Sequence, residues 1–390
     1  MKVKHTSILI FLVYLMVLDI PYLSQTINNI IMLCCEALII YELWNLKCLD
    51  KSIFENKSIL VYLCVVLIAT IVNMGISTRL MTALVIGIEY VLLFVAMKAL
   101  IMIRGTSRTL NGILKITVWI VLIVDLCVIG TRGKGIGGSS ILPYYLIGNK
   151  FAVSYLHMFF LGIFLCKPAI SRNFIRRIIT NIIVTAFCAF ICYMVDCNTG
   201  IVGCIVIGSL TFLIGRKKKI SDFLLRPATY LIIFCGLTFL LVGTQVLLNN
   251  VSFQNIISNV FNRGVTWTGR LEMFQLTLQA FYKQPIWGYG INSTYVQQIL
   301  GWGNAQNGIL KIMLDTGIMG IISFLIVVYS VFYKARKKEN MIKIFPIVSF
   351  LYGMAVCSTV EINISGLYFW ALALVYNVKE SRKDKQTYES

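Results

Sequence analysis

Two arginines that lie seven residues apart, Arg263 and Arg270, are the side chains best suited to binding an anion. They flank a Thr-Trp-Thr-Gly turn that contains Trp267 and predicts a helix beginning near Gly269. An arginine in the first turn of a helix opposes the helix dipole. Arg270 is therefore better explained by an anion that its guanidinium and the helix N-terminus bind together, with a surface arginine at the lipid headgroups as the alternative.

A glycine-rich turn follows this helix, which we expect to end near Lys283 because Gln284-Pro285 stops it. The turn has the sequence W-G-Y-G, and its glycines allow backbone conformations that other residues resist. The chain should reverse there. The next helix should then begin around residues 304–306 and continue to about residue 333.

One polar stripe runs along the start of that next helix. Its members are spaced by three, four and four residues and share one helix face: Asn304, Asn307, Lys311 and Asp315. Ionisable groups inside an apolar helix are costly, so we expect Lys311 and Asp315 to pair with each other and to line a wet cavity. A buried structural pair is the alternative, which the nearby Gly308, Gly317 and Gly320 favour because they allow close helix packing.

A second cationic segment spans residues 131–150. It holds Arg132, Lys134 and Lys150 without one acid, and it is rich in glycine and serine. This composition predicts a flexible segment that binds an anion such as phosphate. A loop that is merely solvated is the alternative interpretation.

The composition is that of a membrane protein. The chain has 390 residues, of which 58% are hydrophobic and 13% charged. Its net charge of +19 comes from short loops between apolar runs, a pattern typical of loops that face anionic lipid rather than nucleic acid. The twelve cysteines lie almost all in apolar runs without a C-x-x-C motif, and there are two histidines, so we predict neither disulfides nor a metal site. No nucleotide-binding or other cofactor motif is present, and the substrate must therefore carry its own activation.

Twelve apolar runs are long enough to be membrane spans. They cover about residues 1–20, 27–46, 59–76, 80–103, 116–130, 151–166, 178–195, 200–215, 228–248, 308–333, 344–358 and 364–378. An even number of spans places both termini on one side. With the termini inside, the inner loops and tails hold 26 of the 35 basic residues, so both termini should be cytoplasmic.

Some ionisable residues lie within the apolar runs. Glu36, Glu89 and Asp125 are near the middle of spans, so they should face the interior of the bundle, where Lys98 or polar side chains can pair with them. His157 is one turn into another span. We interpret these residues as structural first, and His157 as a core side chain with satisfied hydrogen bonds.

Several motifs resemble the signature region of the O-antigen polymerase and O-antigen ligase superfamily. The similar stretches are T-G-R before a helix, P-I-W-G-Y-G, and A-Q-N-G-I-L-K-I-M-L-D-T-G-I-M-G. Within residues 131–155, T-R-G-K-G-I-G-G and I-G-N-K-F-A-V-S-Y look like a loop and helix start of capsule and exopolysaccharide polymerases. Many members have His-Asn where this chain has Gln306-Asn307, and glutamine cannot act as a general base.

The resemblance implies an all-α integral membrane protein with about 12 transmembrane helices and a helical extracellular cap, similar to glycosyltransferases of the GT-C class. An N-terminal bundle would cover residues 1–248 and a large extracellular loop residues 249–307. The C-terminal helices and a cytoplasmic tail would cover residues 308–390. No cofactor is implied.

The resemblance also implies a polysaccharide polymerase of the bacterial cell membrane. This enzyme would transfer the growing glycan from undecaprenyl pyrophosphate to the next lipid-linked repeat unit on the outer face. A chain-length regulator and a flippase of the same pathway are the implied protein partners. Two alternatives remain, an O-antigen ligase with another acceptor and a flippase for lipid-linked oligosaccharides.

Roles for individual residues follow from the resemblance. Arg132 and Arg270 would stabilise the leaving pyrophosphate, while Gln306 and Asn307 would orient sugar hydroxyls. Further substrate contacts are assigned to Arg263, Lys150, Trp267, Lys311, Glu272 and Asp315. If a general base is needed, the outward-side carboxylates to test are Glu272, Asp315 and Glu361.

Overall fold

The apolar runs form α-helices, which satisfy their own backbone hydrogen bonds where water is absent. The structure is a computed structural model, and it describes residues 2–18, 20–48, 55–74, 80–138, 143–167, 174–214, 218–248, 267–301, 305–338 and 341–378. The helices of the first half are α1 (Lys2–Val17), α2 (Gln25–Asn45), α3 (Lys57–Val72), α4 (Leu80–Arg104), α5 (Thr106–Gly130), α6 (Lys150–Leu165) and α7 (Phe174–Met194). Those that follow are α8 (Asn198–Ile214), α9 (Lys218–Leu224), α10 (Pro227–Leu248), α12 (Trp267–Lys283), α13 (Thr294–Leu300), α14 (Gly308–Arg336), α15 (Phe345–Cys357) and α16 (Gly366–Asn377), with a 3-10 helix at Met341–Lys343.

Five helices are each long and apolar enough to cross a membrane: α2, α4, α5, most of α7, and α14. Seven shorter apolar helices accompany them within the described residues. Each of the twelve predicted runs overlaps one of these helices. The chain is therefore an all-α, multi-pass membrane protein, and the number of crossings and the extracellular cap stay predictions.

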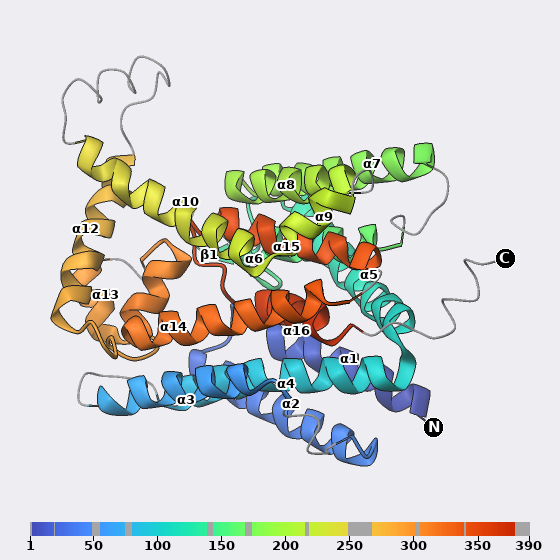
Figure 1. Cartoon of the computed structure of the whole chain (residues 1–390), viewed down its shortest axis with the longest axis horizontal. Helices are drawn as coiled ribbons and strands as arrows, with labels where there is room; N and C mark the ends of the chain where they lie inside the picture. The colour runs from blue at the N-terminus through green and yellow to red at the C-terminus, as the bar shows by residue number, and fades with distance from the viewer. Residues whose placement is uncertain are drawn as a thin grey trace.

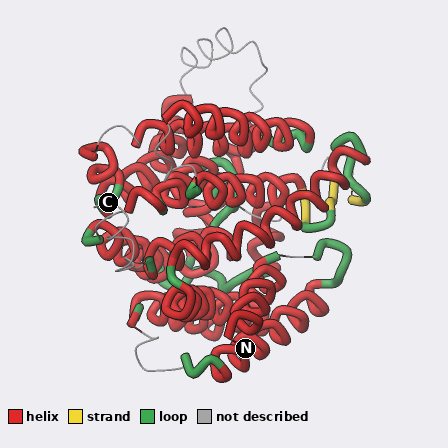
Figure 2. The backbone as a smooth tube through the Cα atoms, turned by 90° about the vertical axis from the view of Figure 1, so that its right-hand side faces the viewer, coloured by secondary structure: helices red, strands yellow, loops and turns green. Residues whose placement is uncertain are grey.

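The long helices lie roughly along one direction, which runs across Figure 1. Polar contacts place the starts of α1 and α3 and the ends of α2, α4, α14 and α16 at one end of the bundle: His5 to Glu42 (2.8 Å), Lys98 to Glu55 (3.0 Å) and Lys338 to the Tyr376 carbonyl (2.6 Å). Figure 2 views the molecule from that end. Helices α12 and α13 lie at the opposite end, on the left of Figure 1.

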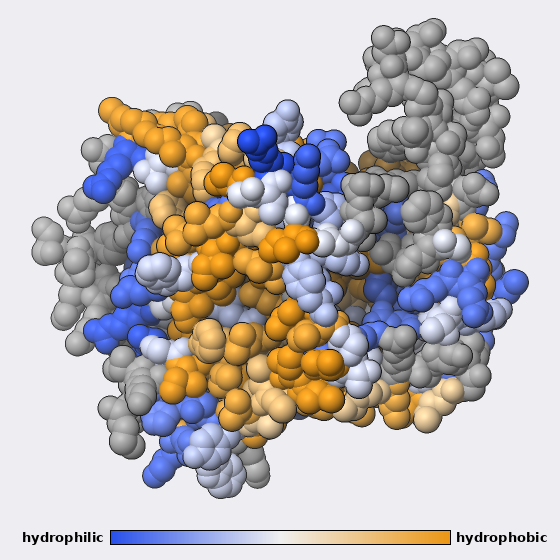
Figure 3. Space-filling view, turned by 180° about the vertical axis from the view of Figure 1, so that it is seen from behind, coloured by the Kyte–Doolittle hydropathy of each residue, from blue (hydrophilic) through white to orange (hydrophobic). Residues whose placement is uncertain are grey.

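The surface agrees with a membrane crossing in that direction. Figure 3 shows apolar side chains gathered across the middle of one face, with hydrophilic side chains toward its left and right ends. Large side chains such as Ile232 and Leu240 of α10 are 69% and 70% exposed. Such exposure would be unfavourable in water, and it is expected where lipid covers the helix.

Two hydrophobic clusters hold the fold together. The large one joins helices from α1 to α10 with the second half of α14, α15 and α16, and Trp370, Phe324 and Phe332 are nearly inaccessible within it. The small cluster joins α12, α13 and the first half of α14, and it includes Phe274, Tyr289 and Leu310. Helices α12 and α13 thus pack against the first part of α14 around a core of their own.

Residues 131–150 were predicted to be a flexible loop, and much of this segment is instead ordered. It forms a small antiparallel sheet of β1 (Gly137–Gly138), β2 (Pro143–Tyr145) and β3 (Gly148–Asn149). The Asn149 side chain then caps α6 by accepting from the amides of Phe151 and Ala152. The sheet fixes the path of the chain between α5 and α6.

Candidate functional site

Helix α14 is broken in its N-terminal part. Gly317 has φ 65° and ψ −162°, which separates a first half, residues 308–316, from a second half, residues 318–336. Such a break frees carbonyl groups at the end of the first half and amide groups at the start of the second. Inside a membrane bundle, these groups need partners from the protein.

The turn at residues 285–290 supplies those partners. The amides of Tyr289 and Gly290 donate to the carbonyls of Leu314 (2.7 Å) and Asp315 (2.9 Å). In the other direction, the amides of Ile318 and Met319 donate to the carbonyls of Pro285 (2.8 Å) and Ile286 (3.3 Å). The predicted W-G-Y-G turn therefore connects the two halves of α14 through four main-chain hydrogen bonds.

Two glycines make this close approach possible. A Cβ atom at Gly317 would lie 2.2 Å from the Ile286 carbonyl oxygen, and one at Gly288 would lie 2.4 Å from that of Leu314. Both residues also have positive φ, which L-residues with a side chain rarely adopt. Gly317 was predicted to allow close helix packing and instead breaks the helix, whereas the glycines of W-G-Y-G form the predicted turn.

The turn is also tied to the rest of the bundle. The Asn73 side chain, at the end of α3, donates to the Gly288 carbonyl at 3.0 Å. Within the small cluster, the buried Tyr289 hydroxyl donates to the Ala280 carbonyl at 2.8 Å. Burial, with a contribution from Tyr295, raises the pKa of Tyr289, so the hydroxyl keeps its proton and stays a donor.

Lys311 and Asp315 form the expected pair just before the break, with 2.6 Å between Nζ and Oδ2. They line a recess between α13 and the first half of α14, together with Asn292, Ser293 and Gln297. The Lys311 side chain is 28% exposed. The three additional polar side chains were not predicted, since they lie 14 to 23 residues earlier in the chain.

Asn307 and Gln306 precede this pair at the start of α14. Asn307 is fully buried and caps the helix, because its side-chain oxygen accepts from the amides of Ile309 (2.9 Å) and Leu310 (3.0 Å). Its side-chain nitrogen donates to the Thr359 carbonyl at 2.9 Å. Gln306 is partly exposed and has φ 45°. Asn307 thus positions α14, and Gln306 has the more accessible side chain.

The other cationic segment presents Arg132 at the end of α5. Arg132 is exposed with φ 51°, and Lys134 is also exposed. Between them, the Gly133 carbonyl accepts from the buried Tyr145 hydroxyl at 2.5 Å. Burial raises the pKa of Tyr145 to about 12, aided by Cys127 and Asp196, so it remains a donor at neutral pH.

Lys150 has an acidic partner that its own segment lacks. Its Nζ lies 3.5 Å from Oδ2 of Asp196, which is in the α7–α8 connection. The Asp196 side chain is 88% exposed, so this pair is weak and open to exchange with other anions.

For the other predicted site residues, the structure gives the helix or connection that contains them, or does not describe them. Trp267, Arg270 and Glu272 lie in the first turns of α12, which begins two residues before the predicted Gly269. Arg263 and Asn304 lie outside the described residues. Glu361 is buried in the connection between α15 and α16, two residues from the Thr359 carbonyl that Asn307 contacts.

Comparison with known families gives one match. A family model described as O-antigen ligase matches residues 183–325. The matched region runs from α7 into the second half of α14, so it contains the start of α12, the 285–290 turn, the break and the recess, while Arg132 and Lys150 lie before it. No curated protein matches the chain. The family match confirms the relationship that the motifs predicted, to the O-antigen polymerase and O-antigen ligase superfamily, and locates it at residues 183–325.

Proposed function

We propose that this chain is a polysaccharide polymerase that transfers a growing glycan from undecaprenyl pyrophosphate to the next lipid-linked repeat unit. The observation that carries the proposal is the O-antigen ligase match over residues 183–325, which includes the polar recess beside the break in α14. The cations of residues 131–150 support it from outside the matched region.

The proposed reaction exchanges one bond at the anomeric carbon of the donor sugar. The bond between this carbon and the pyrophosphate oxygen breaks, and the pyrophosphate leaves with the electron pair. A hydroxyl oxygen of the acceptor sugar forms the new glycosidic bond, and its proton passes to a carboxylate or to the released pyrophosphate. Since negative charge develops on the leaving group, fixed cations lower the barrier.

Arg132 and Arg270 are the cations that we assign to the leaving pyrophosphate, with Lys150 and Arg263 assisting. A guanidinium binds two phosphate oxygens at once, and the first turn of α12 adds backbone donors beside Arg270. Lys150 is available because its exposed partner, Asp196, is easily displaced.

The remaining residues contact the sugars or the proton in this proposal. Gln306 orients a hydroxyl directly, whereas Asn307 acts by fixing the start of α14. Trp267 contacts substrate at the start of α12. Because Asp315 is paired with Lys311, we assign that pair to the walls of the recess. Glu272 and Glu361 are then the carboxylates to test as the base.

The same proposal places the reaction on the outer face of the bacterial cell membrane. The inner loops and tails would hold the 26 basic residues counted above, with both termini in the cytoplasm. A flippase would deliver the lipid-linked unit and a chain-length regulator would control the product. Cysteine substitutions at Lys134 and Asp222, in a background without other reactive cysteines, test this orientation, since only the first should react with an impermeant reagent added outside.

A ligase is the second candidate, because the matching family carries the description O-antigen ligase. It would use the same donor and a different acceptor. Supplying the purified protein with lipid-linked repeat units alone separates the two reactions. Products of two or more repeat units on one carrier support the polymerase, and absence of any product until another acceptor is added supports the ligase.

The decisive variants are at Arg270. We expect Arg270→Ala to lower polymer formation by roughly 100-fold or more, on the scale of losing one donor to a developing anion. Arg270→Lys should fail nearly as badly, because lysine keeps the charge and loses the two-pronged contact. Single lipid-linked units should then accumulate on the outer face of cells.

Lys283→Ala is the matched control, because Lys283 is an exposed cation at the other end of the same helix. It should leave polymer length unchanged. Long polymer in both Arg270→Ala and Arg132→Ala would remove the assignment of these arginines, and units trapped on the inner face would indicate a flippase.

A further inference from the structure

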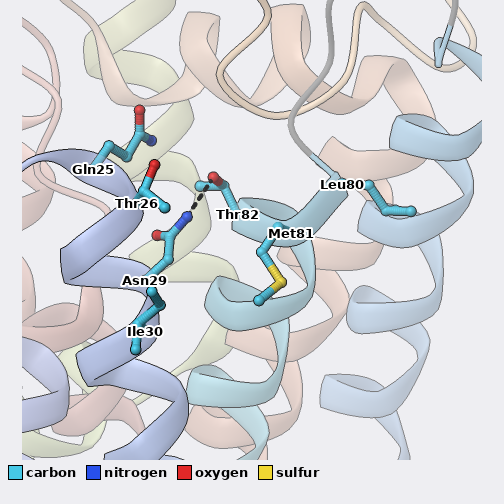
Figure 4. Close-up of a pocket in the computed structure, with 7 residues that line it drawn as sticks. All are labelled: Gln25, Thr26, Asn29, Ile30, Leu80, Met81 and Thr82. Carbon is cyan, nitrogen blue, oxygen red and sulfur yellow. Dashed lines mark hydrogen bonds between the residues drawn. The ribbon is translucent and has the colours of Figure 1, made fainter.

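A pocket outside the matched region opens between the starts of α2 and α4. Its volume is about 520 Å³, and Figure 4 shows the side chains around it. The polar walls are Gln25, Thr26 and Asn29 of α2 with Thr82 of α4, and Ile30 and Met81 add apolar surface. None of the described residues that line it is charged.

The polar groups of this pocket suit hydroxyl groups better than phosphate. The Asn29 side-chain nitrogen donates to the Thr82 hydroxyl oxygen at 3.0 Å, which links the two helices and fixes both side chains (Figure 4). This bond leaves the Asn29 amide oxygen as an acceptor and the Thr82 hydroxyl hydrogen as a donor. The described side chains that line the pocket are neutral, and they offer an anion little compensation for the loss of its hydration.

Hydrogen bonds link the starts and ends of the helices around the pocket to β2 and to the 285–290 turn. Tyr22, three residues before Gln25, donates to the Tyr144 carbonyl of β2 at 3.4 Å, which joins the start of α2 to the sheet that follows Arg132. On the other side, Asn73 at the end of α3 contacts the Gly288 carbonyl of the 285–290 turn. The start of α2, which forms one wall of the pocket, thus contacts the sheet that follows Arg132.

We propose that this pocket binds a neutral sugar of the lipid-linked oligosaccharide. Hydroxyl groups of the sugar bond to the amides and hydroxyls of Gln25, Thr26, Asn29 and Thr82. Its C–H faces pack on Ile30 and Met81, which are 52% and 47% exposed. The inference rests on the proposed function, because it divides one ligand between the arginines, which bind pyrophosphate, and this pocket, which binds sugar.

Binding to the full-length protein in lipid nanodiscs tests the division. One probe is the lipid-linked oligosaccharide extracted from cells that lack this protein, and the other is undecaprenyl pyrophosphate without sugar. We expect Asn29→Leu, which removes the amide, and Thr26→Trp, which fills the pocket, each to weaken binding of the oligosaccharide probe about tenfold. Binding of the sugar-free probe should stay unchanged.

Ile27→Trp is the matched control, because Ile27 is an exposed neighbour on α2 that does not line the pocket. It should bind both probes like the natural protein, and Asn29→Gln should recover part of the lost affinity. Equal weakening of both probes would assign the pocket to the polyprenyl chain and overturn the inference. Unchanged binding in Asn29→Leu and Thr26→Trp would overturn it while leaving the proposed function in place, and failure of the natural protein to bind either probe would overturn both.

Discussion

Two of the acid–base pairs among the described residues, one between α5 and α6 and one within α14, have different surroundings. His157 of α6 and Asp125 of α5 are 2.8 Å apart, and the histidine side chain is completely inaccessible. Lys311 and Asp315 of α14 are 2.6 Å apart, and the lysine side chain is 28% exposed at the polar recess. The two carboxylates are equally exposed, at 12%, so the difference lies in the bases: His157 is enclosed, and we call its pair the sealed pair, whereas Lys311 reaches the recess, and we call its pair the open pair.

In the sealed pair, both ring nitrogens of His157 have hydrogen-bond partners. The His157 Nδ1 hydrogen bonds to the Val153 carbonyl at 2.7 Å, so Nδ1 is the donor and the second ring nitrogen faces Asp125. A second hydrogen bond, 2.8 Å long, joins this nitrogen to Oδ1 of the carboxylate. In the proposed function, the open pair instead lines the recess that contacts substrate. We therefore expect an ionisable residue in an apolar run to belong to a functional site only when a polar space lies beside it.

The largest stability effect should come from breaking the sealed pair. In His157→Leu, the Asp125 carboxylate loses its partner in an apolar core, which should destabilise the protein by about 3–5 kcal/mol. Activity per folded molecule should be unchanged. Thermal unfolding in detergent and an assay normalised to the folded fraction measure both quantities. Lost activity at unchanged stability would show that His157 has a functional role, and the two pairs would then not differ in role.

For the open pair, we expect Lys311→Met to lower activity more than stability, the reverse of His157→Leu. The Lys311 side chain is 28% exposed and lies at a polar recess, so the variant should lose less stability than His157→Leu. Polymer formation should fall strongly, because the recess loses its cation and Asp315 its partner. If Lys311→Met unfolds the protein as severely as His157→Leu, the two pairs are both structural.

Gly317→Ala tests whether the break beside the open pair is required. The new Cβ atom would need positive φ and would meet the Ile286 carbonyl, which should cost about 3 kcal/mol together. Gly236→Ala in α10 is the control, since a Cβ atom there meets no atom within 4 Å, and it should stabilise the helix by about 0.5–1 kcal/mol. Equal melting temperatures for the two variants would show that α14 can be continuous.

Gln306→Ala, at the start of α14, should lower activity less than Lys311→Met. If Gln306 only orients a sugar hydroxyl, activity should fall about tenfold, the scale of one hydrogen bond, and the melting temperature should stay the same. Initial rates with lipid-linked repeat units measure this. Complete inactivity of a normally folded variant would give Gln306 a larger role than the proposal assigns.

Asp125→Asn should have the smallest effect of all. An asparagine can keep a hydrogen bond to His157, so the loss of stability should be below about 1 kcal/mol. Comparison with His157→Leu in the same unfolding assay separates the hydrogen bond from the cost of an unpaired carboxylate. A loss as large as that of His157→Leu would mean that the Asp125 carboxylate itself, rather than a hydrogen bond at this position, stabilises the core.

Much of the helix pattern could be predicted because hydropathy depends on residues that are adjacent in sequence. The ion pairs between different helices could not be predicted, because their members are far apart in the sequence. Asp125 and His157 are 32 positions apart and were interpreted separately, and Lys98 was matched with acids in the spans although it pairs with Glu55. Lys150 likewise finds Asp196 in another connection.

The candidate site was predicted in its residue types more than in its geometry. The stripe from Asn304 to Asp315 correctly paired Lys311 with Asp315, because steps of four residues meet on one helix face. Asn307 belongs to the same stripe by spacing, yet it lies one residue before α14 and caps it. The break at Gly317 depends on carbonyls from residues 285–290, which no local pattern in an apolar run encodes.

The junction in α14 also bears on how such proteins change in evolution. All four hydrogen bonds across it use main-chain atoms, so the side chain of a residue such as Ile286, which is 56% exposed, can drift without loss of the connection. Gly288 and Gly317 cannot be replaced in this way, because a Cβ atom at either position would meet a backbone carbonyl. Among relatives, we expect these two glycines to be retained together, and an insertion in either segment to be accompanied by a change in the other.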